Sequence, residues 1–297
     1  MDETVGLIGL GMLGEIFAGH LAADGRRVLA HDADPARSHP SVERVASAAA
    51  AAAGADVIVL SLPSAAAVDD AMAGVLETAR VGTVVVDTST VDPETNRRWS
   101  AAARARGVGY LDAPLSGGEP MEGGTDGARA ASVTFMVGGD AADLARAEPV
   151  MRLLGSHVFH LGGSGTGSEV KLISNMCSGA YVLVVAEAFA AGAALGIAPE
   201  RLVEVFRHTD AKCFFMTDYL LPRLLAERFD DGFAVRLQLK DHRLFADLAE
   251  RLGIATPVND LARATYEAAM ADDANREITT VVDRAVTAAR AGRARQS

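Results

Sequence analysis

The stretch that decides the fold lies near the amino terminus, where residues 5–14 read VGLIGLGMLG. A short apolar run passes into Gly9-x-Gly11-x-x-Gly14, and a helical pattern follows as far as Asp24. In such a turn the first glycine permits a tight bend, the second lets the backbone approach a pyrophosphate, and the third lets the helix pack on the strand. The positive end of the helix dipole then faces the phosphates. The stretch predicts a dinucleotide site that contacts Gly9, Gly11, Met12, Leu13 and Gly14.

The alternation of strand and helix continues over the next 130 residues or so. Apolar, β-branched runs at 27–31 (RVLAH), 56–62 (DVIVLSL) and 83–87 (TVVVD) are typical of parallel strands buried on both faces. Weaker strand candidates lie at 109–112, 134–138 and 157–161. Alternating elements predict the α/β class, with a doubly wound, Rossmann-type parallel sheet covered by helices. We expect this dinucleotide-binding domain to occupy residues 1–164.

After Gly167 the strand-like runs end and helical periodicity continues almost to the carboxyl terminus. We therefore predict an all-helical domain over residues 165–297, serving substrate binding and oligomerisation. Its first helix is expected to run from near Ser168 to about Leu195. The later half of that helix is apolar on nearly every side, which requires other helices or a partner subunit around it. A homodimer or homotetramer is thus one expectation, and an ordinary core helix is the alternative.

Composition narrows the class of partner. The net charge of −11 argues against nucleic acid or an anionic membrane as the main partner, but it allows a small anionic substrate in a local cationic pocket. The two cysteines have no metal-ligand spacing, so we expect no metal site and a reduced, cytoplasmic setting. No signal peptide is apparent. The apolar stretch 180–197 contains Glu187, which favours a buried helix over a membrane span.

The second predicted strand ends at Asp32, eighteen residues after Gly14. An acid at this place hydrogen-bonds the adenosine ribose and repels a 2′-phosphate, so NAD is favoured over NADP. Arg37 is near enough to keep NADP as the less favoured cofactor, and Asp32 could instead simply cap the loop. The residues that follow the third and fourth strands could form cofactor walls, or they could be ordinary turns: Leu62, Pro63 and Thr90.

Lys171 and Asn175 lie four residues apart after a glycine-rich approach, residues 162–167. Side chains at this spacing share one helix face. A lysine beside an amide can hold a carboxylate-bearing substrate and move a proton, whereas most such pairs elsewhere are solvated surface. Combined with the dinucleotide site, the pair indicates a hydride-transfer enzyme that uses a lysine as acid and base.

Four segments together resemble the β-hydroxyacid dehydrogenase family, the group that contains 3-hydroxyisobutyrate dehydrogenase and tartronate semialdehyde reductase. Residues 6–14 are similar to its cofactor motif, and residues 112–118 (DAPLSGG) to its substrate motif, DAPVSGG. Residues 162–175 match its catalytic signature, and 239–241 (LKD) its carboxyl-terminal element. The resemblance covers nearly the whole chain. It implies hydride transfer between NAD(H) and a small 3-hydroxy acid or its semialdehyde.

The resemblance also implies roles for individual residues. Lys171 would be the general acid and base, which suits a lysine whose pKa a desolvated site brings toward neutrality. Lys240 would close over cofactor and substrate, and Pro63 and Thr90 would contact the cofactor. The carboxylate and hydroxyl of the substrate would be held by Ser116, Gly117, Gly118 and Asn175. A lysine at position 171 also argues against the related imine reductases.

The chain departs from the family pattern at three places. The connection 119–132 is longer than usual and borders the substrate pocket in the family, so a reductase of a different carbonyl compound is one alternative. Met176 follows Asn175 where a second Asn is common, and Glu277-x-Thr279 stands where Asp-x-Ser is more usual. Lys212 is either a surface residue or a contact for a second anionic group. A non-catalytic NAD-binding protein on the same fold is the other alternative, although it would not need Lys171.

Overall fold

The computed structural model describes residues 3–117 and 125–295, which form two compact units. We call residues 3–117 and 125–171 the sheet unit and residues 172–295 the helical unit. The division falls inside one long helix, α7 (Thr166–Leu195), between Lys171 and Leu172. Lys171 therefore belongs to the sheet unit and Asn175 to the helical unit.

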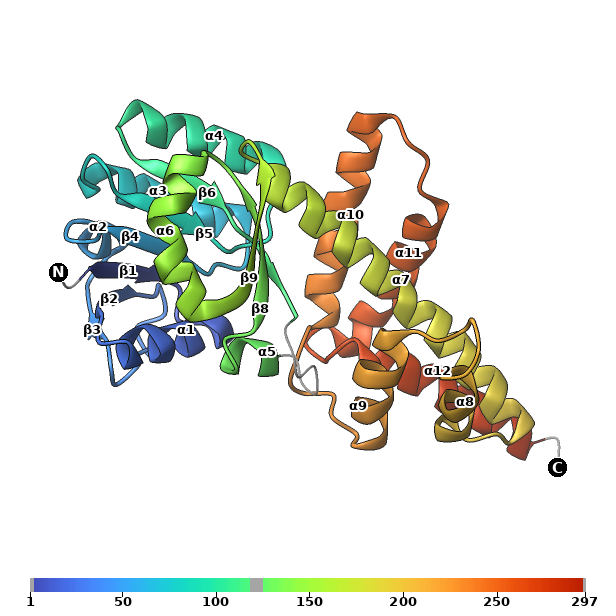
Figure 1. Cartoon of the computed structure of the whole chain (residues 1–297). Helices are drawn as coiled ribbons and strands as arrows, with labels where there is room; N and C mark the ends of the chain where they lie inside the picture. Colours follow the sequence, from blue (N-terminus) through green and yellow to red (C-terminus); the bar gives the residue numbers. More distant parts are fainter. Residues whose placement is uncertain (1–2, 118–124, 296–297) are drawn as a thin grey trace. The chain divides into compact units, whose positions relative to one another are not determined.

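The strands of the sheet unit form one sheet in the order β3-β2-β1-β4-β5-β6-β8-β7, with β9 also paired to β8 (Figure 1). Neighbours from β3 to β6 are parallel, which confirms the predicted doubly wound sheet. β8 differs, because it runs antiparallel to β6 and β7 and parallel to β9. The bounds are β1 (Thr4–Ile8), β2 (Arg27–His31), β3 (Glu43–Arg44), β4 (Val57–Leu60), β5 (Val84–Asp87), β6 (Gly109–Asp112), β7 (Leu115–Ser116), β8 (Val133–Gly138) and β9 (Gly155–Gly162).

Helices cover both faces of this sheet (Figure 1). Because successive side chains of a strand point to opposite faces, Val57 and Val59 belong to the core under α1 and α6, whereas Ile58 and Leu60 belong to the core under α2, α3 and α4. Every one of these four side chains is buried, as the apolar strand pattern predicts. The helix bounds are α1 (Met12–Ala23), α2 (Ala48–Ala52), α3 (Ala65–Thr78), α4 (Pro93–Ala105), α5 (Asp126–Arg129) and α6 (Ala141–Leu154).

The helical unit is built around the later part of α7. Val182, Val185 and Phe189 of α7 are buried in its core together with Tyr266. Apart from the isolated bridge between Ala234 and Glu277, its described residues contain helices and connections only, as predicted. The remaining elements are α8 (Pro199–Phe206), a π-helix η1 (Phe215–Leu220), α9 (Leu221–Leu225), α10 (Val235–Leu252), α11 (Pro257–Asp273) and α12 (Thr279–Ala294).

A buried ionic cluster explains the unusual Glu277-x-Thr279 sequence. The side chains of Arg223 and Glu277 are both fully buried and lie 3.4 Å apart, N to O. The Glu277 carboxylate also accepts hydrogen bonds from the Tyr219 hydroxyl at 2.8 Å and the Thr279 N–H at 2.7 Å. Burial raises the pKa of Glu277, and these partners act in the opposite direction. The longer acid thus ties the start of α12 into the helical core.

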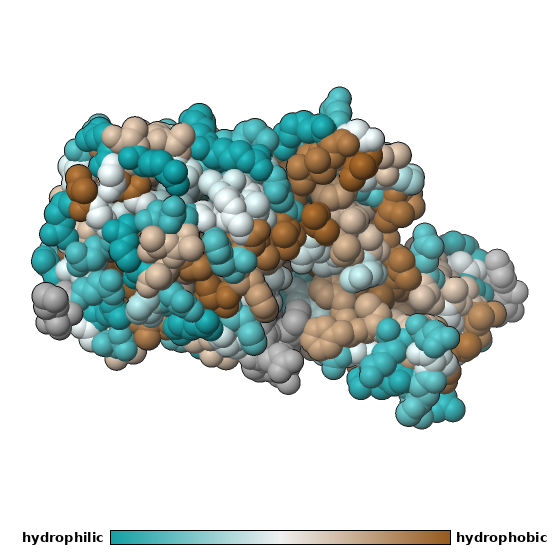
Figure 2. Space-filling model, turned by 45° about the horizontal axis from the view of Figure 1, so that its top comes forward, coloured by the Kyte–Doolittle hydropathy of each residue, from teal (hydrophilic) through white to brown (hydrophobic). Residues whose placement is uncertain are grey.

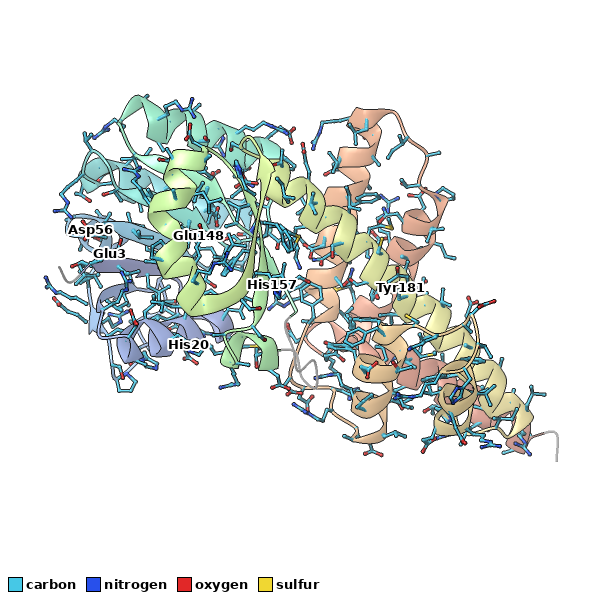
Figure 3. The ribbon with its side chains drawn as sticks, viewed as in Figure 1. Glu3, His20, Asp56, Glu148, His157 and Tyr181 are labelled. Atoms are coloured by element: carbon cyan, nitrogen blue, oxygen red, sulfur yellow. The ribbon has the colours of Figure 1, made fainter. Side chains whose placement is uncertain are left out.

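By length and composition α7 is apolar enough to cross a membrane, and within the described residues it is the one helix with this property. Its buried face nevertheless forms the centre of the helical unit. Its other face exposes Val184 and also Tyr181, which is labelled in Figure 3. Hydrophobic surface is visible over the helical unit in Figure 2.

Candidate active site

The glycine-rich turn lies between β1 and α1 and has the geometry of a phosphate cradle. Gly9 has φ +99°, and a Cβ there would overlap the carbonyl oxygen of Ser61. A Cβ at Gly14 would overlap the carbonyl oxygen of Gly9, so this glycine lets α1 pack on the turn. A Cβ at Gly11 would meet no atom of the described chain within 4 Å. The room beside Gly11, at the start of α1, therefore fits a pyrophosphate group.

The end of β2 supplies the acid expected at the ribose. Asp32 accepts hydrogen bonds from the Leu10 N–H at 2.6 Å and the Asp34 N–H at 2.8 Å, so it joins the glycine turn to the β2 loop. Arg37 donates to the Leu10 carbonyl at 3.1 Å, and Arg44 donates to the Asp32 carbonyl at 3.4 Å. Asp32 thus braces the loop at the end of β2, the position at which we expect an adenosine ribose, with two guanidinium groups nearby.

The carboxyl ends of β4 and β5 form the next part of this edge. The Leu62 N–H donates to Ser89 Oγ at 3.0 Å, which links the two loops across neighbouring strands. Leu62 and Thr90 are partly buried and Pro63 is exposed. All three follow parallel strands at the edge where ligands of such sheets bind, next to the glycine turn. The residues present on this edge therefore fit a dinucleotide.

The substrate-motif segment continues from β6 into β7. Ser116 pairs with Thr134 of β8, Gly117 is exposed, and Gly118 lies outside the described residues. Asp112, the first residue of the motif, is buried, and its two carboxylate oxygens accept hydrogen bonds from the N–H groups of Gly165 at 2.7 Å and Ser168 at 3.0 Å. Burial raises the pKa of Asp112 to about 6, although the two N–H groups lower it.

A buried hydrogen-bond chain reaches the same helix start from the β5 side. Asn96 Nδ2 donates to Ser168 Oγ at 2.6 Å, and the Tyr110 hydroxyl lies 2.9 Å from Asn96 Oδ1 and 2.7 Å from Asp87 Oδ2. The Asp87 carboxyl also accepts the Ser89 N–H at 2.9 Å. Burial raises the pKa of Asp87. The chain of hydrogen bonds connects the loop after β5 with the first turn of α7.

Lys171 lies one turn after Ser168 on α7, and its side chain is 7% exposed. Asn175 follows after four more residues, roughly 6 Å along the helix axis, and is 5% exposed. The alternative of a solvated surface pair therefore does not hold for these two residues. The protein contains three lysines in 297 residues, at positions 171, 212 and 240, and Lys212 is exposed.

The helical unit contains a polar cluster of its own around Asp241 on α10. Asn175 Nδ2 donates to Asp241 Oδ2 at 2.5 Å, and Lys240 Nζ lies 2.9 Å from Asp241 Oδ1. Gln238 Nε2 donates to the Asn175 carbonyl at 2.9 Å. Asp241 is 1% exposed and was not among the predicted site residues. The sequence signal that could have indicated Asp241 is its place directly after Lys240, because an acid next to a lysine can form an ion pair with it.

A glycine lets α7 approach α10 at this cluster. A Cβ at Gly179, four residues after Asn175, would overlap the imidazole of His242 and the amide of Gln238. His242 is buried, its Nδ1 lies 2.7 Å from Asn259 Oδ1, and burial lowers its pKa. These close contacts fix Asn175 relative to Asp241 within the helical unit.

The long connection after β7 is only partly described. Residues 118–124 lie outside the described part, while residues 126–129 form α5. His20 of α1 (labelled in Figure 3) lies with Nε2 2.9 Å from the Ala128 carbonyl oxygen, and Ala128 is buried. The second half of the predicted loop is therefore packed on the sheet unit.

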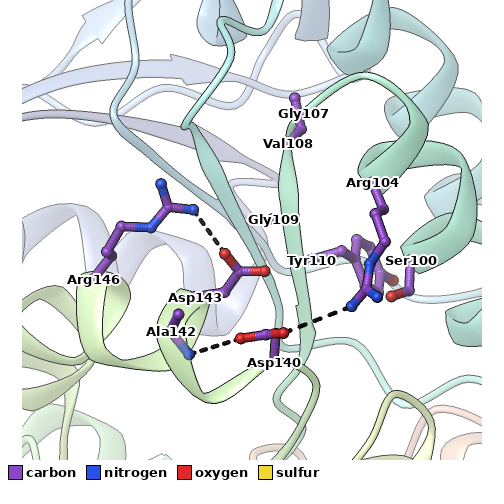
Figure 4. A pocket seen from close by; sticks show the side chains of 10 residues that line it. All are labelled: Ser100, Arg104, Gly107, Val108, Gly109, Tyr110, Asp140, Ala142, Asp143 and Arg146. Carbon is purple, nitrogen blue, oxygen red and sulfur yellow. Dashed lines mark hydrogen bonds and ion pairs between the residues drawn. The ribbon is translucent and has the colours of Figure 1, made fainter.

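A separate cavity of about 300 Å³ opens near the amino end of β6 (Figure 4). Gly109 and Tyr110 line it, and Asp140 and Asp143 make ion pairs with Arg104 at 3.8 Å and Arg146 at 2.7 Å. This is the opposite edge of the sheet from Asp112, so the cavity is not part of the candidate site. In the described part of the chain, no group of three or more His, Cys, Asp or Glu side chains could hold a metal ion.

Two family models match the chain. The model described as the NAD binding domain of 6-phosphogluconate dehydrogenase matches residues 4–162, which is more than half of the chain. The model described as the NAD-binding domain of NADP-dependent 3-hydroxyisobutyrate dehydrogenase matches residues 165–284. The two matches meet close to the start of α7.

Named relatives match over nearly the full length. The 2-(hydroxymethyl)glutarate dehydrogenase of Eubacterium barkeri is 32% identical, with 94% of this chain and 93% of the relative covered. The 3-hydroxyisobutyrate dehydrogenase of Pseudomonas aeruginosa is 34% identical, with 92% and 94% covered. The structure of Mycobacterium tuberculosis 3-hydroxyisobutyrate dehydrogenase with L-serine has a TM-score of 0.86 and 30% identity, with 96% and 99% covered.

Proposed function

Because the chain belongs to the β-hydroxyacid dehydrogenases, a family of NAD-dependent enzymes acting on CH–OH groups, we propose that it interconverts a small 3-hydroxy acid and its semialdehyde. The observation that carries the proposal is the buried Lys171, placed at the start of α7 next to the edge of the sheet that fits the dinucleotide. The bound nicotinamide would accept the hydride in oxidation and supply it in reduction.

The relatives narrow the substrate class. 2-(Hydroxymethyl)glutarate, 3-hydroxyisobutyrate and L-serine, which are named for the proteins compared above, share a hydroxymethyl group on the carbon that bears the carboxylate. They differ in the third substituent on that carbon. The proposed substrate therefore has the form HOCH₂–CHR–COO⁻, in which the group R is the feature to be identified.

Lys171 is proposed as the general acid and base. In oxidation its neutral amine takes the proton of the substrate hydroxyl as hydride leaves the carbon, and in reduction its ammonium returns a proton to the carbonyl oxygen. Asn175, one turn further along α7, is proposed to hydrogen-bond the substrate, and Asp241 holds its amide at 2.5 Å. A fixed amide orients the reacting hydroxyl, which lowers the entropic part of the barrier.

The substrate carboxylate is assigned to the Ser116 hydroxyl and the backbone N–H groups of Gly117 and Gly118, because glycine lets an anion approach the backbone closely. Lys240 is proposed to close over cofactor and substrate. Its ion pair with Asp241 leaves 28% of its side chain exposed, so it retains contact with solvent.

The first experiment follows NADH absorbance with NAD and a panel of acids: 3-hydroxyisobutyrate, 2-(hydroxymethyl)glutarate, L-serine, glycerate, 3-hydroxypropionate and 4-hydroxybutyrate. Turnover of members that carry the hydroxymethyl group beside the carboxylate supports the proposal. If no acid in the panel is turned over while NADH still binds, the proposal is contradicted. That result would favour a different carbonyl substrate, with a pocket altered by the 119–132 connection.

Lys171→Ala separates an enzyme from a binding protein. General acid–base catalysis contributes about 10²- to 10⁴-fold, so kcat should fall by that factor while the Kd for NADH stays unchanged. Lys212→Ala is the matched control, since Lys212 is exposed and should tolerate the change. Turnover of Lys171→Ala near the wild-type rate would contradict the assigned role.

We also propose a homodimer or homotetramer in the cytoplasm. Val184 and Leu195 of α7 are 66% and 73% exposed, and such apolar positions are typical of a subunit interface. Cys177 and Cys213 are free thiols, consistent with a reducing compartment. Light scattering during size-exclusion chromatography tests the assembly: a monomer at micromolar concentration would contradict it, and Val184→Glu should weaken a dimer or tetramer.

A further inference from the structure

We propose that Asp112 is the positioning residue for Lys171: its carboxylate, presented from the end of β6, caps the first turn of α7 and sets where the lysine stands. The inference rests on the acid–base role proposed for Lys171. It gives a separate function to the first residue of the DAPLSGG segment, in which Ser116, Gly117 and Gly118 are assigned to the substrate.

The first turn of α7 has no cap of its own. Gly165 precedes the helix and has no side chain, and its φ of +94° is a left-handed conformation that suits glycine. An N-cap side chain normally accepts the N–H of the third helical residue, which here is Ser168. Asp112 accepts that N–H at 3.0 Å and the Gly165 N–H at 2.7 Å. The Asp112 carboxylate, which lies 56 residues before Ser168 in the chain, therefore serves as the N-cap of α7.

Glycines of two segments allow this close docking. A Cβ at Gly167 would lie 2.6 Å from the Asp112 carbonyl oxygen and 2.9 Å from its Oδ2. A Cβ at Gly138 of β8 would lie 2.7 Å from Asp112 Oδ1. Such distances are too short for any side chain, so the carboxylate is enclosed by backbone and held in one place. Part of the glycine pattern in the catalytic signature thus serves the docking of α7 on β6.

Ser168 couples the position of the Asp112 carboxylate to that of Lys171. Its N–H is held by Asp112 and its hydroxyl by Asn96, whose Nδ2 donates at 2.6 Å. Ser168 is fully buried. Lys171 lies three residues later, on the same side of the helix. A shift of the first turn therefore shifts the lysine, and a displacement of about 1 Å can cost roughly 10²-fold in rate.

Asp112→Asn tests the inference, because the asparagine side chain has nearly the same volume as the aspartate side chain. The amide offers one acceptor oxygen where the carboxylate offers two, so one helix N–H loses its partner. We expect kcat to fall about 10- to 100-fold, with the Kd for NADH unchanged. The decisive measurement is a double-mutant cycle: in a Lys171→Ala background, Asp112→Asn should not change the residual kcat, because a residue that acts through Lys171 has nothing left to position.

Asp140→Asn is the matched control, because Asp140 caps α6 through the Ala142 N–H at 2.8 Å, at the opposite edge of the sheet, and its loss should leave kcat unchanged. Wild-type kcat in Asp112→Asn overturns the inference, as does an equal loss of kcat with and without Lys171. If Asp112→Asn does not fold, Ser168→Ala replaces it: it removes the Asn96 contact and should lower kcat only when Lys171 is present. Failure of the lysine role itself is distinguishable, since Lys171→Ala alone would then keep its activity.

Discussion

Asn175 on α7 and Asp241 on α10 are joined by a buried hydrogen bond of 2.5 Å, from the amide nitrogen to one carboxylate oxygen. The other oxygen of Asp241 lies 2.9 Å from the ammonium group of Lys240. One acid therefore fixes two residues that are proposed to contact the substrate. This arrangement explains why a buried acid follows directly after a partly exposed lysine.

Asp241→Asn should raise the KM for the hydroxy acid about tenfold or more, because an amide cannot accept the Asn175 hydrogen bond and pair with Lys240 in the same way. Breaking a charged, buried partner costs about 1.5–3 kcal/mol, which corresponds to this range. Steady-state kinetics with saturating NAD measures the effect. Asp247→Asn, on the exposed side of the same helix, is the control. An unchanged KM in Asp241→Asn would mean that Asn175 and Lys240 do not depend on the acid.

Two glycine substitutions in the same turn should have different effects. Gly11→Ala places a methyl group in the room assigned to the pyrophosphate, so NADH affinity should fall at least tenfold while the melting temperature is unchanged. Gly14→Ala forces the helix away from the turn and should lower stability by about 1–3 kcal/mol. Calorimetry and NADH fluorescence separate the outcomes. Tight NADH binding by Gly11→Ala would show that the phosphates lie elsewhere.

Cofactor preference should depend on Asp32 and its cationic neighbours. Asp32→Ser removes the negative charge and leaves the guanidinium groups of Arg37 and Arg44 beside the loop. We expect weaker NADH binding and stronger NADPH binding, for a combined shift of about 10- to 100-fold in their ratio. Adding Arg37→Ala should reverse the gain in NADPH binding. If the wild-type protein already prefers NADPH, the assignment of Asp32 to the ribose is wrong.

The raised pKa of Asp112 should make the free energy of unfolding depend on pH. Burial raises it to about 6 from an ordinary value near 3.8, against the effect of the Gly165 and Ser168 N–H groups, and the charge of Asp87 raises it further. The folded state therefore binds this proton more tightly than the unfolded chain. The associated stability is fully present below pH 3.8 and is lost as the pH rises through about 6.

Relative to Asp112→Asn, the wild-type free energy of unfolding should thus increase by about 3 kcal/mol as the pH falls from about 7 to below 4, at about 1.36 kcal/mol per pKa unit. Urea titrations of both proteins at several pH values measure the difference. A difference that stays constant, or that decreases toward low pH, would contradict the raised pKa.

The sequence was most informative where one local rule determines structure. The glycine turn and the apolar strand runs predicted the Rossmann-type sheet, and helical periodicity predicted the helical unit, because each pattern depends on neighbouring residues only. The start of α7 was predicted near Ser168 and lies at Thr166. The antiparallel direction of β8 was not predicted, since strand direction depends on the path of the chain between strands and not on the composition of the strand itself.

The sequence predicted the residues that are proposed to contact the ligands. It did not predict the residues that hold those contact residues in place. Lys171 and Asn175 share a helix face, which spacing alone indicates. The residues that hold the site bond to partners far away in the sequence: Asp112 and Asn96 to Ser168, 56 and 72 residues away, and Asp241 to Asn175, 66 residues away. No local sequence pattern encodes such separations. Burial of a charged or amide side chain at each of these positions became visible only in the folded structure.

The distant cap on α7 has a consequence for the order in which the chain matures. Asp112 at the end of β6 accepts the Gly165 and Ser168 N–H groups at the start of α7, so the turn that carries Lys171 becomes ordered only when β6 is already in place. Synthesis runs from the amino terminus, and amino-terminal domains fold first. The strand β6, which carries Asp112, is therefore synthesised before residues 165–171, which depend on it. We expect amide protons of this turn to gain protection from exchange after those of β6, so a newly made chain acquires its cofactor site before it acquires the proposed proton donor, Lys171.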